Sequence, residues 1–289
     1  MENFDLHNHS NCSDGLLAPA ALVALAARNG CDAVALTDHD TTLGLAEAGA
    51  AAHRAGVRFI RGVEISVTWQ PEGVHTTLHI VGLDIDETCP ALCAGLQSIR
   101  DGRRERAKRI AADFDRIGIA GTLEGAYRFA ENPDMIGRTH FARFLVEQKV
   151  VKDLGGAFQR YLVRGKPGYV SHEWASLPDA VGWIRAAGGV PVIAHPGRYK
   201  ISAAQMRALL AEFKALGGRA IEVITGSHTR QHFAEYARYA REFGFLASRG
   251  ADFHGPGESA FSPGKLPPLP ADLVPVWSAF SAAPAPAAS

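Results

Sequence analysis

Two histidines and an aspartate stand close together near the start of the chain, in the sequence "FDLHNHSNCSD". An extended strand directs alternate side chains to one side, so His7 and His9 are expected to project together, about 7 Å apart. Two neighbouring imidazoles repel each other when protonated, but a shared metal ion stabilises the pair. Asp14 adds a carboxylate nearby. These residues alone also fit two surface histidines at a frayed N-terminus.

Further residues of ligand type end or flank other expected strands. His39 ends the buried segment "CDAVALTDHD", and Glu64 lies in "VRFIRGVEISVTW". The later candidates are His79 in "LHIVG", His195 in "VIAHP", and Asp252 and His254 in "GADFH". A single histidine at a strand end is more often structural, but in barrels of parallel strands the C-terminal strand ends converge on one mouth. The repeated position therefore favours one shared metal centre.

Some neighbouring residues are given other roles. His79 is preferred to His75 because it lies within an apolar strand, whereas His75 lies in a loop-like stretch. Asp38 and Asp40 are expected to orient the histidine between them rather than to bind metal. A structural interpretation is kept for the histidines on or beside expected helices, which are His53, His228 and His232.

The bulk composition limits the kind of partner. Lys and Arg number 30, as do Asp and Glu, so the net charge of zero gives no sign of general polyanion binding. The cysteines lack the Cys-x-x-Cys spacing of zinc sites and are expected to be reduced thiols. Neither a signal peptide nor an apolar run of membrane-spanning length is recognisable, so we expect a cytoplasmic protein without membrane contact.

Strand-like and helix-like segments alternate through most of the sequence, which predicts a parallel α/β architecture. Between about 92 and 166 this alternation gives way to helices with charged faces, which indicates a helical insertion. We therefore expect a body formed by residues 1–91 and 167–270, the insertion at 92–166, and a disordered Ala/Pro-rich tail at 271–289.

Taken together, the motifs resemble the PHP (polymerase and histidinol phosphatase) family of metal-dependent phosphoesterases. They are "DLHNHSNCSDG", "ALTDHD", "GVEIS", "LHIVGLDI", "VIAHPG" and "GADFH", within residues 1–90 and 185–255. Within this family the chain is similar to a bacterial subgroup of nucleotide 3′,5′-bisphosphate phosphatases and a related RNA-trimming exonuclease. That subgroup carries a "GRPH"-like motif in a helical insertion; here it reads "IGRTHFARFLV", with Thr139 in place of proline.

The resemblance implies a distorted (β/α)7 barrel that holds up to three metal ions. One ion would be bound by His7, His9, Glu64 and Asp252, a second by Glu64, His79 and His195, and a third by Asp14, His39 and His254. Imidazoles mixed with carboxylates suit Mn, Fe or Zn better than Mg or Ca. We expect two to three divalent transition-metal ions per chain, with manganese as the first candidate and iron or zinc as alternatives.

Phosphate ester hydrolysis needs charge neutralisation more than covalent chemistry, so we expect in-line attack of metal-activated water without a phosphoenzyme intermediate. The proton could be transferred by His254, by Asp252 or by water.

The outward-facing phosphate oxygens need positively charged or polar side chains to bind them, for which the candidates are Arg138, His140, Arg143, Lys166, Ser171 and Arg198. Arg103, Arg104 and Arg106 lack a flanking motif and are interpreted as solvated helix surface. Tyr169 or Trp174 could stack on a base.

The leading hypothesis is a phosphatase that removes the 3′-phosphate from nucleoside 3′,5′-bisphosphates. Neutral net charge favours a small nucleotide over a long polymer, because polymer affinity rises with the number of phosphates neutralised. The alternatives are a 5′–3′ exoribonuclease acting on short RNA ends, a histidinol-phosphate phosphatase, and a non-catalytic metal-binding module. All the expected ligand positions carry metal-competent side chains, which favours catalysis over the last alternative. Oligomeric state and base preference stay open.

Overall fold

The computed structural model of the chain describes residues 2–71 and 75–281. Its strands are β1 (Phe4–Asp5), β2 (Ala33–Leu36), β3 (Arg58–Trp69), β4 (Thr76–Leu83), β5 (Ala175–Ser176), β6 (Val190–Ile193), β7 (Ala220–Thr225) and β8 (Leu246–Gly250). Its α-helices are α1 (Pro19–Arg28), α2 (Leu45–Ala55), α3 (Pro90–Arg116), α4 (Thr122–Tyr127), α5 (Arg138–Glu147), α6 (Leu154–Ala157), α7 (Leu177–Ala186), α8 (Ala203–Ala215) and α9 (Arg230–Phe243). Short helical turns are η1 (Pro133–Met135), η2 (Phe158–Leu162), η3 (Pro196–Arg198) and η4 (Val276–Ala279).

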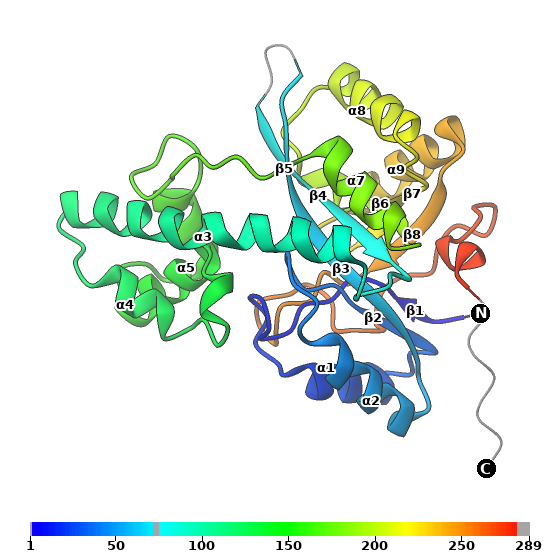
Figure 1. Cartoon of the computed structure of the whole chain (residues 1–289), viewed down its shortest axis with the longest axis horizontal. Helices are drawn as coiled ribbons and strands as arrows, with labels where there is room; N and C mark the ends of the chain where they lie inside the picture. The colour runs from blue at the N-terminus through cyan, green and yellow to red at the C-terminus, as the bar shows by residue number, and fades with distance from the viewer. Residues whose placement is uncertain (1, 72–74, 282–289) are drawn as a thin grey trace.

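The strands form one curved sheet that closes on itself. Its spatial order is β1-β2-β3-β4-β6-β7-β8, with β5 paired to β3. Backbone hydrogen bonds join the two ends of this order: the Leu6 amide donates to the Arg249 carbonyl (3.0 Å) and the Asp252 amide donates to the His7 carbonyl (2.8 Å). Helices cover the outside of the sheet (Figure 1). The expected distorted α/β barrel is therefore confirmed.

The distortion of the barrel lies at β4. This strand runs antiparallel to both β3 and β6, whereas β1, β2 and β3, and likewise β6, β7 and β8, are parallel. His79 lies in the first half of β4, opposite Ser66 of β3. It still reaches the same mouth as the other candidates because the strand direction is reversed. The uniformly parallel sheet expected from the sequence is thus wrong at this one strand.

Alternate residues of the strands belong to two separate apolar cores. On β2, Val34 and Leu36 pack in the cluster that includes residues of the outer helices. Ala33 and Ala35 belong to a second cluster, made of strand residues together with Val276. Because strand side chains alternate in direction, this second cluster fills the barrel interior.

The helical insertion forms a lobe that extends from the barrel (Figure 1). Helix α3 is shared by both parts, because Leu96 and Ile99 join the barrel core whereas Ile110 and Phe114 join the core of the lobe. The core of the lobe also contains Phe141 of α5. The expected insertion boundary near 92 therefore lies inside a continuous helix, and its status as a separate folding unit stays a prediction.

Part of the segment expected as a disordered tail has a defined place in the structure. Val276 is fully buried, Pro275 pairs with Ala247, and the Trp277 ring lies 4.6 Å from that of Phe4, measured between centroids. Residues 282–289 of the expected tail lie outside the described residues. Among the described helices, none has the length and apolar character needed to span a bilayer.

Candidate active site

The nine side chains expected as metal ligands lie together at one mouth of the barrel. Their donor atoms form four overlapping groups, and within each group all of these atoms lie within 4.8 Å of one another. The groups are His7–His9–Asp252, His7–Glu64–His195, His39–Glu64–His79 and His9–Asp14–His39–His254. Every expected ligand belongs to at least one group, and every group mixes imidazole with carboxylate.

Glu64 occupies the centre of this arrangement and is fully buried. Its Oε1 lies 2.8 Å from Nε2 of His195, 2.9 Å from Nδ1 of His79 and 3.3 Å from Nε2 of His7. Its Oε2 lies 2.7 Å from Nδ1 of His39. Burial alone would raise the pKa of Glu64, but the charges of His79, His39 and His7 hold that pKa well below its usual value. The carboxylate is therefore ionised and available to a cation.

Several buried atoms at this mouth lack a hydrogen-bond partner among the described residues. They include Oδ1 of Asp14, Oδ1 of Asp252 and Nδ1 of His9. A buried carboxylate oxygen without a partner is costly unless a cation satisfies it. The same donor set of imidazole nitrogens and carboxylate oxygens is the one that transition-metal ions prefer. The residues present therefore fit a divalent transition-metal centre.

Glu222 on β7 is a residue that the sequence analysis missed. Its Oε1 lies 2.8 Å from Nδ1 of His7, and its Oε2 accepts the backbone amide of His195 at 2.5 Å. A proton on Nδ1 of His7 leaves Nε2 free to face the ligand group, as in carboxylate–histidine–metal arrangements. The sequence feature that could have indicated this role is an acidic residue within the otherwise apolar segment "AIEVIT". His195 itself has a positive φ of 26°, an uncommon conformation that this hydrogen bond holds in place.

The two aspartates beside His39 act on other residues than expected. Asp38 accepts hydrogen bonds from the amide of Ser10 (2.7 Å) and the hydroxyls of Ser10 and Ser13 (both 2.6 Å). Asp40 accepts from the amide (2.7 Å) and hydroxyl (2.9 Å) of Ser66. They therefore fix the loop and the strand that carry ligands, and the expectation that they orient the intervening imidazole is corrected.

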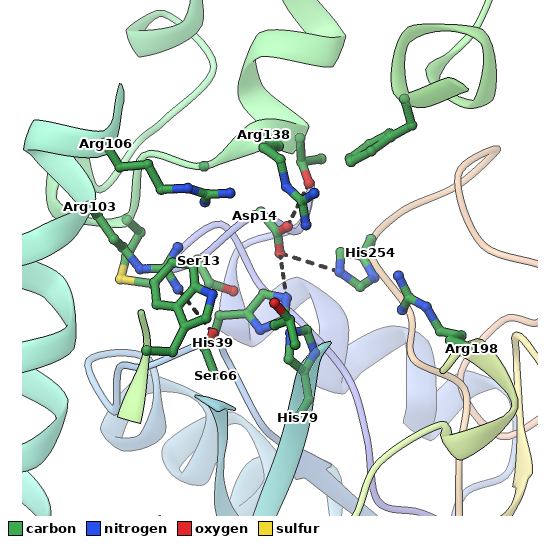
Figure 2. Close-up of a pocket in the computed structure, with 16 residues that line it drawn as sticks. Ser13, Asp14, His39, Ser66, His79, Arg103, Arg106, Arg138, Arg198 and His254 are labelled. Carbon is green, nitrogen blue, oxygen red and sulfur yellow. Dashed lines mark hydrogen bonds and ion pairs between the residues drawn. The ribbon is translucent and has the colours of Figure 1, made fainter. Parts of the chain in front are cut away.

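A pocket opens beside the metal-ligand groups, and guanidinium groups from both parts of the chain line it (Figure 2). Arg198 follows β6 in the barrel, Arg138 begins α5, and Arg103 and Arg106 come from α3. The interpretation of these two α3 residues as solvated surface is wrong, because they are only 7% and 6% exposed. Their burial comes from packing across the mouth, which the local sequence does not reveal.

The guanidinium groups differ in whether a carboxylate neutralises them. Arg103 pairs with Asp40, and Arg198 pairs with Asp252 at 3.1 Å. Within the described part of the chain, Arg106 forms no ion pair with a carboxylate, and the same holds for Arg138, the residue that begins α5. The pocket thus contains two cationic groups, Arg106 and Arg138, that could bind an anion.

Aromatic rings support these two arginines. The guanidinium carbon of Arg106 lies 5.2 Å from the ring centroid of Trp174, and that of Arg138 lies 5.7 Å from the centroid of Phe158. Burial, together with the charges of Arg138 and Arg103, lowers the pKa of Arg106 to about 9. An anion between these groups would relieve both the repulsion and the lost hydration.

His140 and Arg143, two of the expected substrate residues, lie behind the pocket wall. His140 is fully buried, and its Nδ1 accepts the amide of Gly137 at the start of α5 (3.0 Å). Arg143 pairs with Glu258 at 2.7 Å and donates to the backbone carbonyl of Asp14 at 2.6 Å. Arg143 therefore holds the insertion against the barrel, whereas the hydrogen bond of His140 caps the start of α5 within the insertion.

The other expected substrate residues divide between the pocket and the surface. Arg138 and Arg198 line the pocket, as does Trp174, one of the two aromatic candidates. Lys166 and Ser171 are exposed and are not among the residues that line it. The roles of all these residues toward substrate stay predictions.

Comparison with known proteins gives consistent matches. The sequence profile of the PHP domain matches residues 5–148. The chain is 52% identical over 282 residues to the 3′,5′-nucleoside bisphosphate phosphatase of Chromobacterium violaceum, covering 98% of each chain. It is 41% identical over 279 residues to a 5′-3′ exoribonuclease of Haemophilus influenzae, covering 96% of this chain and 99% of the relative. The solved structure of an amidohydrolase from Chromobacterium violaceum, with bound sulfate and no metal, superimposes with a TM-score of 0.92 at 52% identity, covering 96% of this chain and 95% of the other.

Proposed function

We propose that this chain, which belongs to the PHP family of metal-dependent phosphoesterases, removes the 3′-phosphate from nucleoside 3′,5′-bisphosphates. The products are the nucleoside 5′-monophosphate and inorganic phosphate. The observation that carries this choice of substrate is the pair of cationic groups without carboxylate partners, Arg106 and Arg138, beside the metal-ligand groups. A substrate with two phosphates satisfies both halves of the pocket, and the 52% identical relative bears the name of this activity.

The metal ions would be held by the residues that converge at the barrel mouth, which are His7, His9, Asp14, His39, Glu64, His79, His195, Asp252 and His254. We propose two to three ions per chain, with manganese as the metal. When bound, they supply Lewis-acid stabilisation of the charge that develops on the phosphate oxygens and lower the pKa of water. Glu222 keeps the ring of His7 in the orientation that this role requires.

The residues of the chain itself bind and orient the substrate. Arg198, fixed beside Asp252, is positioned to donate to an outward-facing oxygen of the 3′-phosphate. Arg106 and Arg138 receive the 5′-phosphate, for which the planar guanidinium offers paired, charge-assisted hydrogen bonds. His254, at the pocket edge in Figure 2, and Asp252 are our candidates for proton transfer to the leaving oxygen.

A comparison of substrates tests this proposal. Initial rates of phosphate release would be measured with adenosine 3′,5′-bisphosphate, adenosine 3′-monophosphate and histidinol phosphate, at matched concentrations of Mn²⁺. We expect kcat/KM for the bisphosphate to exceed the other two by about a hundredfold or more, because loss of one phosphate leaves Arg106 and Arg138 without an anionic partner. A preference for histidinol phosphate would overturn the substrate assignment.

Trimming of short RNA is the second candidate function. It is supported by the 41% identity to an exoribonuclease over nearly the whole chain, and an RNA 5′-end presents a phosphate that the same arginines could bind. A 5′-phosphorylated oligoribonucleotide should be included in the assay, and its products separated by length. Stepwise release of mononucleotides with a higher kcat/KM than that for the bisphosphate would establish this function instead.

A further inference from the structure

Thr139 connects the helical insertion to an expected metal ligand in the barrel. Its Oγ1 donates a hydrogen bond to Oδ2 of Asp14 at 2.9 Å. Thr139 follows Arg138 in the first turn of α5, at the position where the sequence departs from the "GRPH"-like motif. A proline has no hydroxyl, so this contact depends on the residue that this chain carries.

The hydrogen bond determines which oxygen of Asp14 faces the other ligands. With Oδ2 taken by Thr139, the buried Oδ1 lies 3.3 Å from Nε2 of His254 and 3.8 Å from Nε2 of His39. Oδ1 has no hydrogen-bond partner among the described residues. Figure 2 shows Asp14 between these two histidines on one side and the insertion on the other. One carboxylate oxygen is thus held by the insertion, and the other is presented to a cation.

Two other hydrogen bonds from the insertion reach the backbone of the loop beside Asp14. Asn132 donates to the carbonyl of Cys12 at 3.1 Å, and Arg143 donates to the carbonyl of Asp14 at 2.6 Å. These two hydrogen bonds fix the path of the chain but leave the Asp14 side chain free to rotate. Thr139 is therefore placed to fix that rotation.

We propose that Thr139 is a positioning residue through which occupancy of the Asp14–His39–His254 metal site depends on the helical insertion. This inference rests on the proposed metal centre, and its test needs no substrate. Arg138 precedes Thr139 in the same helical turn and lines the pocket, so an anion bound there and a metal bound by Asp14 act on one rigid segment.

The experiment titrates metal-free protein with Mn²⁺ by calorimetry and checks stoichiometry by elemental analysis after equilibration with buffered metal. Thr139→Val removes the hydroxyl at constant shape, and Thr139→Ala is a second variant with the same expectation should the first fail to fold. We expect one class of site to weaken by about tenfold or more, as is usual when an outer partner of a metal ligand is lost. Thr139→Ser should bind Mn²⁺ within about twofold of the wild type, because it keeps the hydroxyl.

Thr122 in α4 provides a matched control. It is buried in the same insertion, and its hydroxyl has no hydrogen-bond partner among the described residues. Thr122→Val should leave Mn²⁺ affinity and stoichiometry unchanged. In a double-mutant cycle, Thr139→Val should add little to the loss caused by Asp14→Asn, because both changes act on one interaction.

Three results would overturn the proposal. They are wild-type Mn²⁺ binding by Thr139→Val or Thr139→Ala, an equal loss in Thr139→Ser, and full additivity with Asp14→Asn. A wrong choice of substrate would leave all of these measurements intact, since they read metal binding in the absence of nucleotide. Failure of the substrate assay and failure of this inference are therefore distinguishable.

Discussion

The two walls of the pocket differ in how their charges are balanced. On the barrel wall, the buried carboxylate of Glu64 lies within 3.3 Å of nitrogens on four histidines, which are His7, His39, His79 and His195. On the insertion wall, Arg106 is almost as deeply buried, yet it meets an aromatic ring and other guanidinium groups. One wall therefore presents donor atoms to cations, and the other presents cations to an anion.

This contrast indicates that catalysis and the choice of substrate depend on different walls of the pocket. The barrel wall carries the residues that would bind metal, which is the part of the chemistry common to any phosphate ester. The insertion wall carries no such residues; under the proposed function it would bind a second negative group on the same molecule. Changes on the two walls should consequently be distinguishable by their effects on metal content and on substrate preference.

The largest effect is expected for Glu64→Gln on the barrel wall. A neutral amide at the centre of the ligand groups should remove metal and reduce kcat by about a thousandfold or more, because several kcal/mol of charge stabilisation depend on the metal. Elemental analysis and initial rates would measure both. Glu87→Gln, at an ion pair with Arg61 on the surface, is the control. Retention of metal and of kcat within tenfold by Glu64→Gln would contradict our assignment of the centre.

On the insertion wall, Arg106→Met should reduce kcat/KM for adenosine 3′,5′-bisphosphate by about a hundredfold, since charge-assisted hydrogen bonds to one phosphate are lost. The value for adenosine 3′-monophosphate should change less than about threefold, and the metal content should stay the same. Arg104→Met is the matched control, because Arg104 lies on the same helix with its side chain 63% exposed. Equal losses for both substrates would show that Arg106 does not select for a second phosphate.

A smaller effect is expected for Glu222→Gln, behind the barrel wall. The amide nitrogen would donate to Nδ1 of His7 and so move the ring proton to Nε2, the atom that faces the other ligands. We expect Mn²⁺ affinity to fall by about 10- to 100-fold, with an unchanged ratio of kcat/KM between the bisphosphate and the monophosphate. A change in that ratio would place Glu222 in substrate selection instead.

The smallest effect concerns pH and compares one buried histidine from each region. Burial lowers the pKa of His140 in the insertion and of His228 in the barrel, in each case to about 4. Above pH 6.5 both histidines are neutral whether the chain is folded or unfolded. Between pH 6.5 and 4 the unfolded chain binds more protons, so the free energy of unfolding decreases as the pH falls through this range.

At pH 5 each of these histidines should lower the stability of metal-free protein by up to about 2 kcal/mol relative to pH 7. Urea unfolding at the two pH values would measure this difference. His140→Gln and His228→Gln should each flatten the pH dependence, whereas His53→Gln, at an exposed position, should not. A pH dependence identical to that of the wild type in both buried variants would refute the explanation.

The sequence was most informative where side chains of metal-ligand type recur at similar positions along several expected strands. Ligand-type residues at or near the expected strands, together with the family motifs, predicted the nine side chains that the structure brings together. The direction of β4 was missed, although the connection 70–75 is too short for a parallel crossover and favours a hairpin. The burial of Arg106 was missed for a different reason. Its burial depends on Trp174, which is distant in sequence, and helical periodicity carries no information on such a partner.

The closure of the barrel has a consequence for biosynthesis. The segment that carries His7 and His9 directly follows β1 and bonds to the segment after β8. The Asp252 amide donates to the His7 carbonyl, and the Ala251 amide donates to the Asp5 carboxylate across 246 positions of sequence. A nascent chain cannot form these pairings until the segment around residue 252 has left the ribosome. The complete ligand set is therefore available to metal only after the segment with Asp252 and His254 has been synthesised, which places metal binding late in folding.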